Sequence, residues 1–326
     1  MGSLLGQIPS TTQAAFLKKL ADDVFGGNPF FKMMTKGGEL VEFDGGENIR
    51  CPIITGKSNG GPYSRMETLV APDSGNIDSA RFDWKQFYAS EGLDGLALAQ
   101  NDGIEKQIDI WGAKLESIKM TLADALATSY STVSGSGLST DLTLLEEIVG
   151  AGTKEIGSLT STEVPTWAGA AQDSTGAALT YALLLNTYMD ASEDMIHPNI
   201  LLTSKAGYAV VDAIFQQNQR YLGSDEKFGF ENLKFKDSLV VFDSHVSDGS
   251  GTVTGSSDNA AGDAYTGLRI LYLNTDFLKF VAHRDNFFRV KEVEPDYQDG
   301  KVAFVFLYGN IICNNRRFQA VRHNFT

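Results

Sequence analysis

One apolar stripe constrains this chain more strongly than any other feature. Large apolar residues between positions 101 and 131 recur every three or four residues, so they fall on one side of an α-helix. They are Ile104, Ile108, Trp111, Leu115, Ile118, Leu122 and Leu126. Asn101 or Asp102 can cap its start, and Gly135 and Gly137 lie past its end. A helix over 101–131 would be about 45 Å long, which exceeds most helices of globular proteins.

Upstream of this helix, residues 48–89 form a long β-hairpin excursion. The outgoing strand is predicted over Asn48–Thr55 and the returning strand over Ile77–Ala89. The connection between them is rich in Gly, Pro, Ser and Asn, and it is far longer than the roughly two to five residues of an ordinary hairpin loop. Because it carries few apolar side chains, a neighbouring surface is needed to order it.

Residues 1–47 are predicted to form an arm. A short helix is indicated by the spacing of Ala14, Phe16, Leu17, Leu20 and Val24. The pair Gly26–Gly27 ends this helix, and Asn28–Pro29 then favours an extended turn through Phe30 and Phe31. An arm of this kind cannot bury its own surface, so we expect it to reach a neighbouring molecule.

A mixed α/β body is predicted over residues 138–275. Helices are expected at Leu179–Ala191 and Ala206–Gln217. Short buried strands are expected at Asn199–Thr203, Leu239–Asp243 and Leu268–Leu273. The last part of the chain is rich in strand, with predicted segments at Phe287–Val293, Val302–Cys313 and Asn314–Val321.

Charge limits the functions open to the chain. It holds 27 Lys and Arg against 41 Asp and Glu, for a net charge of −14 at pH 7. Binding to nucleic acid through its phosphates needs a basic face, so a dedicated DNA-binding protein is a poor match. Anionic membrane surfaces are disfavoured for the same reason. No apolar run approaches the roughly 18 residues that cross a bilayer, and we expect no membrane partner.

Two short motifs suggest catalysis but lack the context that catalysis requires. Residues 56–60 match G-x-S-x-G around Ser58, yet Gly61 and Pro62 follow where a nucleophile elbow needs a helix. The same segment contains the last three residues of a phosphate-binding loop without its first glycine or its helix. We therefore expect no catalytic or cofactor-binding residues and no enzyme activity.

Metal binding has one weak candidate. Asp243, His245 and Asp248 could surround a metal at the end of a strand, although a polar turn explains the same residues. Cys51 and Cys313 have no CxxC partner, which excludes zinc sites of that type. We expect no metal site and two free, buried thiols.

The order of the parts resembles one family. An arm is followed by a long β excursion, one very long helix, an α/β body and closing strands. The segments that carry the resemblance are Ile77–Tyr88, the 101–131 helix, Ile156–Gly157 with Pro165–Trp167, and Asn314–Gln319. In this order they resemble the major capsid proteins of tailed bacteriophages, which have the HK97-like fold. The resemblance covers essentially the whole chain.

The resemblance implies an α+β architecture with named parts. An N-terminal arm spans 1–47 and the extended loop 48–89. A peripheral domain comprises 90–137 and 276–326 and contains the spine helix at 101–131. An α/β axial domain spans 138–275.

The same resemblance implies a function. The chain is expected to assemble into hexamers and pentamers of an icosahedral phage head around double-stranded DNA, which it touches only weakly. Assembly would occur in the cytoplasm of a bacterial host, and the chain would reside in the virion capsid. Expected partners are further copies of itself, a separate scaffold protein, a portal and a decoration protein.

Candidate contacts between subunits follow from these parts. The arm would bury Phe16, Phe30 and Phe31 against a neighbour. On the extended loop, Arg65 and Glu67 are the expected charges and Met66, Leu69 and Val70 the expected apolar anchors. Near the C-terminus, Arg316 and Arg317 could touch DNA or an adjacent subunit.

Three alternatives remain open at this point. A nanocompartment shell of the encapsulin type has the same fold and encloses enzymes instead of DNA. A minor virion protein, such as a tail component, would form tubes or rings. An α/β hydrolase would use Ser58 as its nucleophile.

Overall fold

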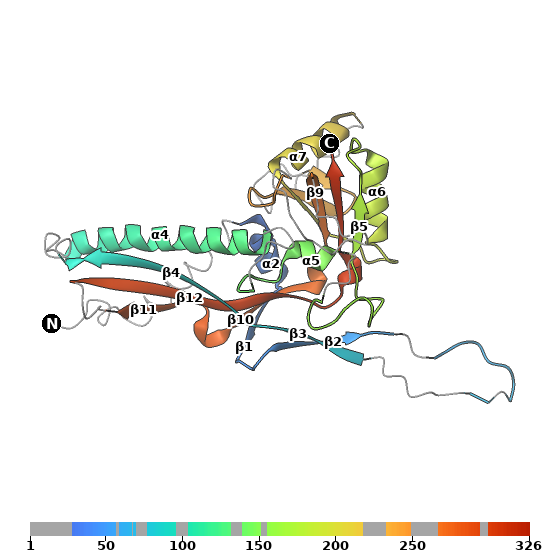
Figure 1. Cartoon of the computed structure of the whole chain (residues 1–326), viewed down its shortest axis with the longest axis horizontal. Helices are drawn as coiled ribbons and strands as arrows, with labels where there is room; N and C mark the ends of the chain where they lie inside the picture. The colour runs from blue at the N-terminus through green and yellow to red at the C-terminus, as the bar shows by residue number, and fades with distance from the viewer. Residues whose placement is uncertain are drawn as a thin grey trace.

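The computed structural model describes residues 28–56, 59–66, 68–69, 77–95, 104–131, 139–150, 155–217, 233–248, 267–293 and 299–326. Within these ranges the strands form a five-stranded sheet, a six-stranded sheet and a two-stranded hairpin. Figure 1 shows an elongated molecule. The hairpin projects from one end, and the long helix α4 lies along the five-stranded sheet at the other.

The five-stranded sheet is built around one long strand. Its members are β1 (Leu40–Phe43), β4 (Lys85–Asp94), β10 (Leu278–His283), β11 (Arg289–Val293) and β12 (Gly300–Cys313). β12 pairs antiparallel with β4 over Gly300–Gly309 and, on its opposite edge, with β11 over Val302–Phe306. Its last part, Gly309–Cys313, pairs antiparallel with β10. Helix α4 (Ile104–Ser131) packs on β4 and buries Ile118, Leu122 and Leu126 in the main core. The apolar stripe thus forms the helix that it predicts.

The six-stranded sheet forms a separate layered body. Its strand order is β5 (Ala170–Asp173), β13 (Ala320–Phe325), β9 (Leu268–Leu273), β6 (Ile200–Thr203), β8 (Ser238–Phe242) and β7 (Leu233–Phe235). Helices α6 (Tyr181–Asp190) and α7 (Lys205–Gln217) cover one face. The short helix α5 (Leu145–Val149) covers the other and joins this sheet to the main core.

The expected helices and strands of this body are confirmed. Because apolar strands such as Ile200–Thr203 are buried on both faces, their sequences read as continuous apolar runs. No helix in the described part of the chain is long and apolar enough to cross a membrane.

The hairpin consists of β2 (Ile49–Ile54) and β3 (Ile77–Phe82). The returning strand was predicted as one piece over Ile77–Ala89, but it breaks at Asp83–Trp84. Before the break it pairs with β2, and after the break it continues as β4 and pairs with β12. Asn310 Nδ2 donates to the Asp83 carbonyl at 2.8 Å and holds the break in place.

The segment after Gly27 is a helix, and the predicted extended turn there is wrong. Helix α2 spans Pro29–Gly37. The Asn28 side-chain oxygen accepts hydrogen bonds from the backbone amides of Phe30 at 3.0 Å and Phe31 at 3.2 Å. Asn28 is therefore an N-cap, and Pro29 occupies the first helical position, which needs no amide donor.

The C-terminal segment also departs from expectation. The predicted strand over Asn314–Val321 is replaced by a 3-10 turn at Arg316–Phe318 and by β13, which begins at Ala320. β13 lies inside the six-stranded sheet between β5 and β9. The expected assignment of all of 276–326 to the peripheral domain is therefore wrong for its last strand, because Val321 and Ala320 are buried in the cores on the two faces of that sheet.

Candidate functional site

The projecting hairpin exposes apolar side chains that its own chain does not cover. Met66 is 96% exposed, and Ile54, Tyr63, Leu69 and Ile77 are exposed large apolar residues of the same segment. Such a concentration is unusual for a free surface and is typical of an interaction site. Arg65 is also exposed here. Of the other predicted contacts, Phe16, Glu67 and Val70 lie outside the described residues.

The base of the hairpin is firmly packed. Ile49, Ile53, Ala80 and Phe82 are buried in a small core with the turn-rich segment 156–167. The Arg81 amide donates to the Gly157 carbonyl at 2.7 Å. The indole Nε1 of Trp167 donates to the Ile156 carbonyl at 2.9 Å, which fixes the segment on its other side. The hairpin thus has an anchored base and an uncovered far end.

Phe30 and Phe31 do not reach a neighbour, and their prediction as contacts between subunits is wrong. Both rings are buried in the main core of their own chain. Phe31 meets Tyr130 edge to face at 5.4 Å and Phe280 at 5.3 Å between ring centroids. The cap at Asn28 turns the chain into α2 and directs both rings inward.

Arg316 is likewise an interior residue, and its prediction as a contact with DNA or another subunit is wrong. Arg316 is 1% exposed, and its guanidinium donates to three backbone carbonyls at the end of α5 and to that of Trp167. Arg317 differs because its side chain is partly exposed. It pairs with Glu193 and lies over the Phe318 ring at 5.0 Å. A contact of Arg317 with a neighbour stays a prediction.

An aromatic row lies on the face of the five-stranded sheet that α4 does not cover. Alternate residues of β12 point to opposite faces, so Ala303, Val305 and Leu307 enter the core. The residues between them, with one from β4, remain partly or largely exposed. We define the aromatic row as Tyr88, Phe304, Phe306 and Tyr308.

The aromatic row has a definite setting. Tyr88 pairs with Phe306, and Arg289 of β11 pairs with Phe306 on its other side. Strands β4 and β12, which carry the row, lie away from the projecting end of the hairpin (Figure 1). Sequence reasoning missed this surface, although the alternating apolar residues of Val302–Cys313 carried the signal.

A polar pocket opens beside the base of the hairpin. Its volume is about 380 Å³, and its lining includes Arg81, Lys85, Asp83, Asp141 and Glu147. Positively and negatively charged side chains both line the pocket. The pocket therefore suits a polar partner and not an apolar ligand. It lies between the hairpin and the described segment 139–147.

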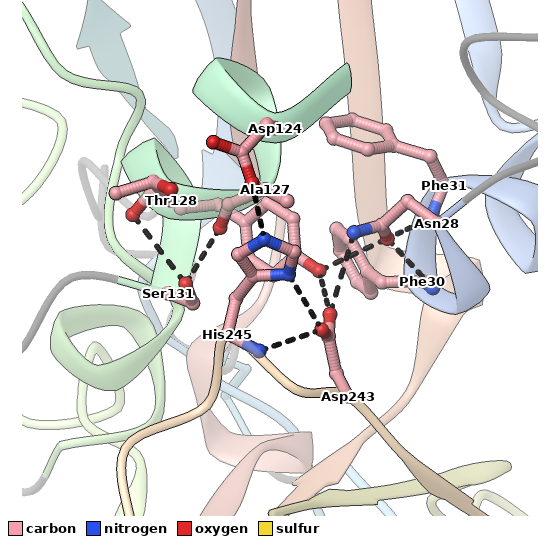
Figure 2. A network of polar contacts seen from close by, with 10 residues as sticks. Asn28, Phe30, Phe31, Asp124, Ala127, Thr128, Ser131, Asp243 and His245 are labelled. Carbon is pink, nitrogen blue, oxygen red and sulfur yellow. Dashed lines mark hydrogen bonds and ion pairs between the residues drawn. The ribbon is translucent and has the colours of Figure 1, made fainter. Parts of the chain in front are cut away.

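The candidate metal ligands form a protein network instead. The Asp243 carboxylate accepts hydrogen bonds from Asn28, from Tyr130 and from the backbone and ring of His245 (Figure 2). Its oxygens are therefore used by protein donors. Across the described ranges, no group of three or more His, Cys, Asp or Glu side chains is placed to hold a metal ion.

The serine motif and the two cysteines form no active site among the described residues. Ser58 lies outside them, and residues 59–66, which follow it, are extended chain and a turn and not the helix of a nucleophile elbow. Cys51 and Cys313 are free and buried, as expected. Burial raises the pKa of the Cys313 thiol to about 12, so it stays protonated and unreactive near neutral pH.

Comparison with known proteins identifies the architecture. No family model and no curated protein matches the sequence. The structure is similar to the capsid asymmetric unit of cyanophage A-1(L), with 12% identity, a TM-score of 0.63 and coverage of 89% of this chain and 90% of that one. The capsid of a native GTA particle is similar at 14% identity and a TM-score of 0.59, covering 89% and 88%.

A shell of another kind shares the same architecture. The holo-SrpI encapsulin complex from Synechococcus elongatus is similar at 9% identity and a TM-score of 0.55, covering 88% of this chain and 85% of that one. The α/β hydrolase alternative has no counterpart among these similarities. Over nearly its whole length, the chain has the HK97-like α+β fold that the order of its parts indicated.

Proposed function

We propose that this protein is the major capsid protein of a tailed bacteriophage and assembles into the hexamers and pentamers of an icosahedral head. The observation that carries the proposal is the projecting hairpin, whose apolar end is left uncovered by its own chain. Its anchored base presents this end at a fixed place. The similarity of the fold to capsid proteins supplies the setting in which such a surface is used.

The contact between subunits is head to tail in this proposal. The segment 54–77 of one copy covers the aromatic row of the next. Ile54, Tyr63, Met66 and Leu69 supply apolar surface on one side, and the row supplies it on the other. Because the two surfaces differ, the contact is heterologous and can close into rings. Each contact buries a modest apolar area, but a shell repeats the contact many times.

The remaining assignments follow from the same proposal. A net charge of −14 suits a container that encloses DNA and grips it weakly. The chain would assemble in the cytoplasm of a bacterial host and reside in the virion capsid. A separate scaffold protein, a portal and a decoration protein are its proposed partners. Catalysis forms no part of this role.

Deleting residues 58–72 tests the hairpin directly. The base of the hairpin retains its packing against residues 156–167, so the deleted chain should give an unchanged circular dichroism spectrum. In negative-stain electron microscopy of the chain co-expressed with its neighbouring genes, the intact protein should give closed polyhedral particles. The deletion should give none. Normal particles from the deleted chain would remove the basis of the proposal.

A matched pair of substitutions at Met66 separates apolar contact from loop length. Met66→Asp places a charge where the proposal buries apolar surface, and Met66→Leu keeps that surface. Burying one such side chain is worth about 1.5–3 kcal/mol, so Met66→Asp should lower particle yield by at least about tenfold. Met66→Leu should assemble like the parent chain. Equal yields from both would contradict a buried position.

A nanocompartment shell is the second candidate, favoured by the similarity to the encapsulin complex. The two roles differ in what the particle holds. Particles purified after nuclease treatment should contain protected double-stranded DNA if the chain forms a phage head. Protein cargo without nucleic acid, identified by mass spectrometry, would decide for the nanocompartment.

A further inference from the structure

A buried carboxylate collects donors from three segments of the chain. Asp243, just after β8, is 2% exposed and accepts from Asn28 Nδ2 at 3.3 Å and from the Tyr130 hydroxyl. It also accepts from the His245 backbone amide at 2.9 Å and faces the His245 ring Nδ1 at 3.0 Å. A carboxylate surrounded by donors acts only as an acceptor, so Nδ1 carries a hydrogen.

The phenol in this network is a secure donor. The pKa of Tyr130 lies well above its ordinary value of 10.0. Burial is the main cause, and the nearby charge of Asp243 is the second. Tyr130 therefore keeps its proton at every pH at which the fold is studied, and a titration near neutrality must come from another group.

The second nitrogen of the His245 ring faces another carboxylate. Nε2 lies 2.9 Å from Oδ1 of Asp124, which projects from α4 toward the ring (Figure 2). A neutral imidazole has only one N–H group, and Nδ1 already uses it. The lone pair on Nε2 would then point at a carboxylate oxygen. Only the imidazolium ion donates to both carboxylates, so the geometry favours the charged ring.

This ring joins parts of the fold that have no backbone pairing with each other. Asp243 and His245 follow a strand of the six-stranded sheet, whereas Asp124 belongs to the helix on the five-stranded sheet. Asn28 adds the start of α2 to the same cluster. A change of charge at His245 is therefore placed to alter how these two bodies are held together.

We propose that His245 is a pH-controlled latch, which in its charged form fastens helix α4 to the turn after β8 and on losing its proton releases Asp124. The latch belongs to the single chain and goes beyond the proposed function, so it does not depend on shell assembly. It is a regulatory site that the chain carries at the junction of its two bodies.

The titratable groups bonded to the ring are Asp124 from α4 and Asp243 from the end of β8. The Tyr130 phenol and the uncharged Asn28 at the start of α2 bond to Asp243. Burial lowers the pKa of His245, but hydrogen bonds to Asp124 and Asp243 outweigh burial and raise it above 6.5. Because the folded pKa is raised, the stabilisation is fully present below about pH 6.5 and is lost as pH rises through the higher folded value.

Exchange of the imidazole carbon-bound hydrogen, followed by mass spectrometry, measures the pKa of each histidine in the full chain. His245 should titrate above 6.5 in the parent protein. In Asp124→Asn it should titrate about 1 pH unit lower, because a neutral amide no longer favours the cation. Asp124 is largely exposed, so this variant should fold. A parent midpoint at or below 6.5, or no change in Asp124→Asn, would overturn the proposal.

Backbone amide exchange of residues 239–248 measures the latch itself. After correction for intrinsic rates, protection in the parent chain should fall at least about threefold as pH rises through the His245 midpoint. In Asp124→Asn the protection should be weaker and independent of pH. His283→Gln is the control, because that ring accepts from the Asp285 amide and contacts the Trp84 ring, with no bond to Asp124 or Asp243. Its profile should match the parent. Amide protection that does not change with pH in the parent chain would show that no latch operates.

Discussion

Arg316 shows how one side chain can organise several turns of backbone. Its nitrogens donate to the carbonyls of Ile148 at 3.1 Å, Trp167 at 3.0 Å, Glu147 at 2.8 Å and Gly150 at 2.9 Å. Three of these oxygens lie at the C-terminal end of α5, where helix carbonyls lack partners and a cation is favourable. The guanidinium thus connects α5 to the segment that supports the hairpin.

Replacing Arg316 with Lys should destabilise the fold. An ammonium group cannot reach all four carbonyls, and each buried acceptor left without a donor costs about 1–3 kcal/mol. Arg316→Lys should therefore lower the free energy of unfolding by about 2–4 kcal/mol, as measured by urea denaturation. Arg317→Lys is the matched control, and its exposed ion pair should change stability by less than about 1 kcal/mol. A loss below 1 kcal/mol at Arg316 would refute this role.

At the scale of residues, a local signal was present in the sequence but was misinterpreted. Asn28–Pro29 is a readable N-cap followed by a first-turn proline, although it was interpreted as an extended turn. The network at Asp243 carries no such signal, because its bond to Asn28 joins residues 215 positions apart. Only the tertiary fold brings those groups together. The buried position of Arg316 could not be predicted either, because a pair of arginines in the sequence does not indicate which side chain turns inward.

The elements differ in how far the sequence determines them. Helix α4 was predicted because its period continues without interruption over many turns. The break between β3 and β4 was not predicted, because alternation indicates a strand without naming its partner. The expected division into arm, extended loop, peripheral domain and axial domain stays a proposal, corrected at its C-terminal strand.

The hairpin base depends on a glycine. Gly157 has φ +64°, and a Cβ there would lie 3.0 Å from both Ala80 Cβ and the Phe82 ring. Gly157→Ala should therefore lose about 2–4 kcal/mol of unfolding free energy and weaken amide protection in β2 and β3. Gly176 has φ +77° with nothing within 4 Å, so Gly176→Ala isolates the backbone cost of about 1–2 kcal/mol. Equal losses from the two variants would mean that the contact is unimportant.

The whole molecule presents two unlike surfaces, the exposed hairpin and the aromatic row. If the hairpin end of one copy covers the aromatic row of the next, each chain uses its hairpin in one contact and its aromatic row in another. Such a contact differs from a two-fold interface, in which the same patch serves both partners. Mixing chains that have each lost one surface can distinguish the two arrangements.

Complementation should reveal the polarity of the contact. A chain lacking 58–72 keeps only the receiving surface, and Tyr88→Asp keeps only the hairpin. Each variant alone should remain monomeric, because one half of every contact is missing. Their equimolar mixture should give dimers and no larger rings in sedimentation velocity. Monomers alone in the mixture would contradict a pairing of hairpin with aromatic row, and closed particles would contradict the head-to-tail arrangement.

The partner switch between β3 and β4 has a mechanical consequence. The strand that returns from the hairpin continues, after its break at Asp83–Trp84, into a ladder that pairs β4 with β12 from Lys85–Gly309 to Asp94–Gly300. Its hydrogen bonds run across the strands, so a pull along the strand loads many of them together and does not peel them one by one. Tension on the hairpin would thus pass into the five-stranded sheet of the same chain and be shared by the whole β4–β12 ladder.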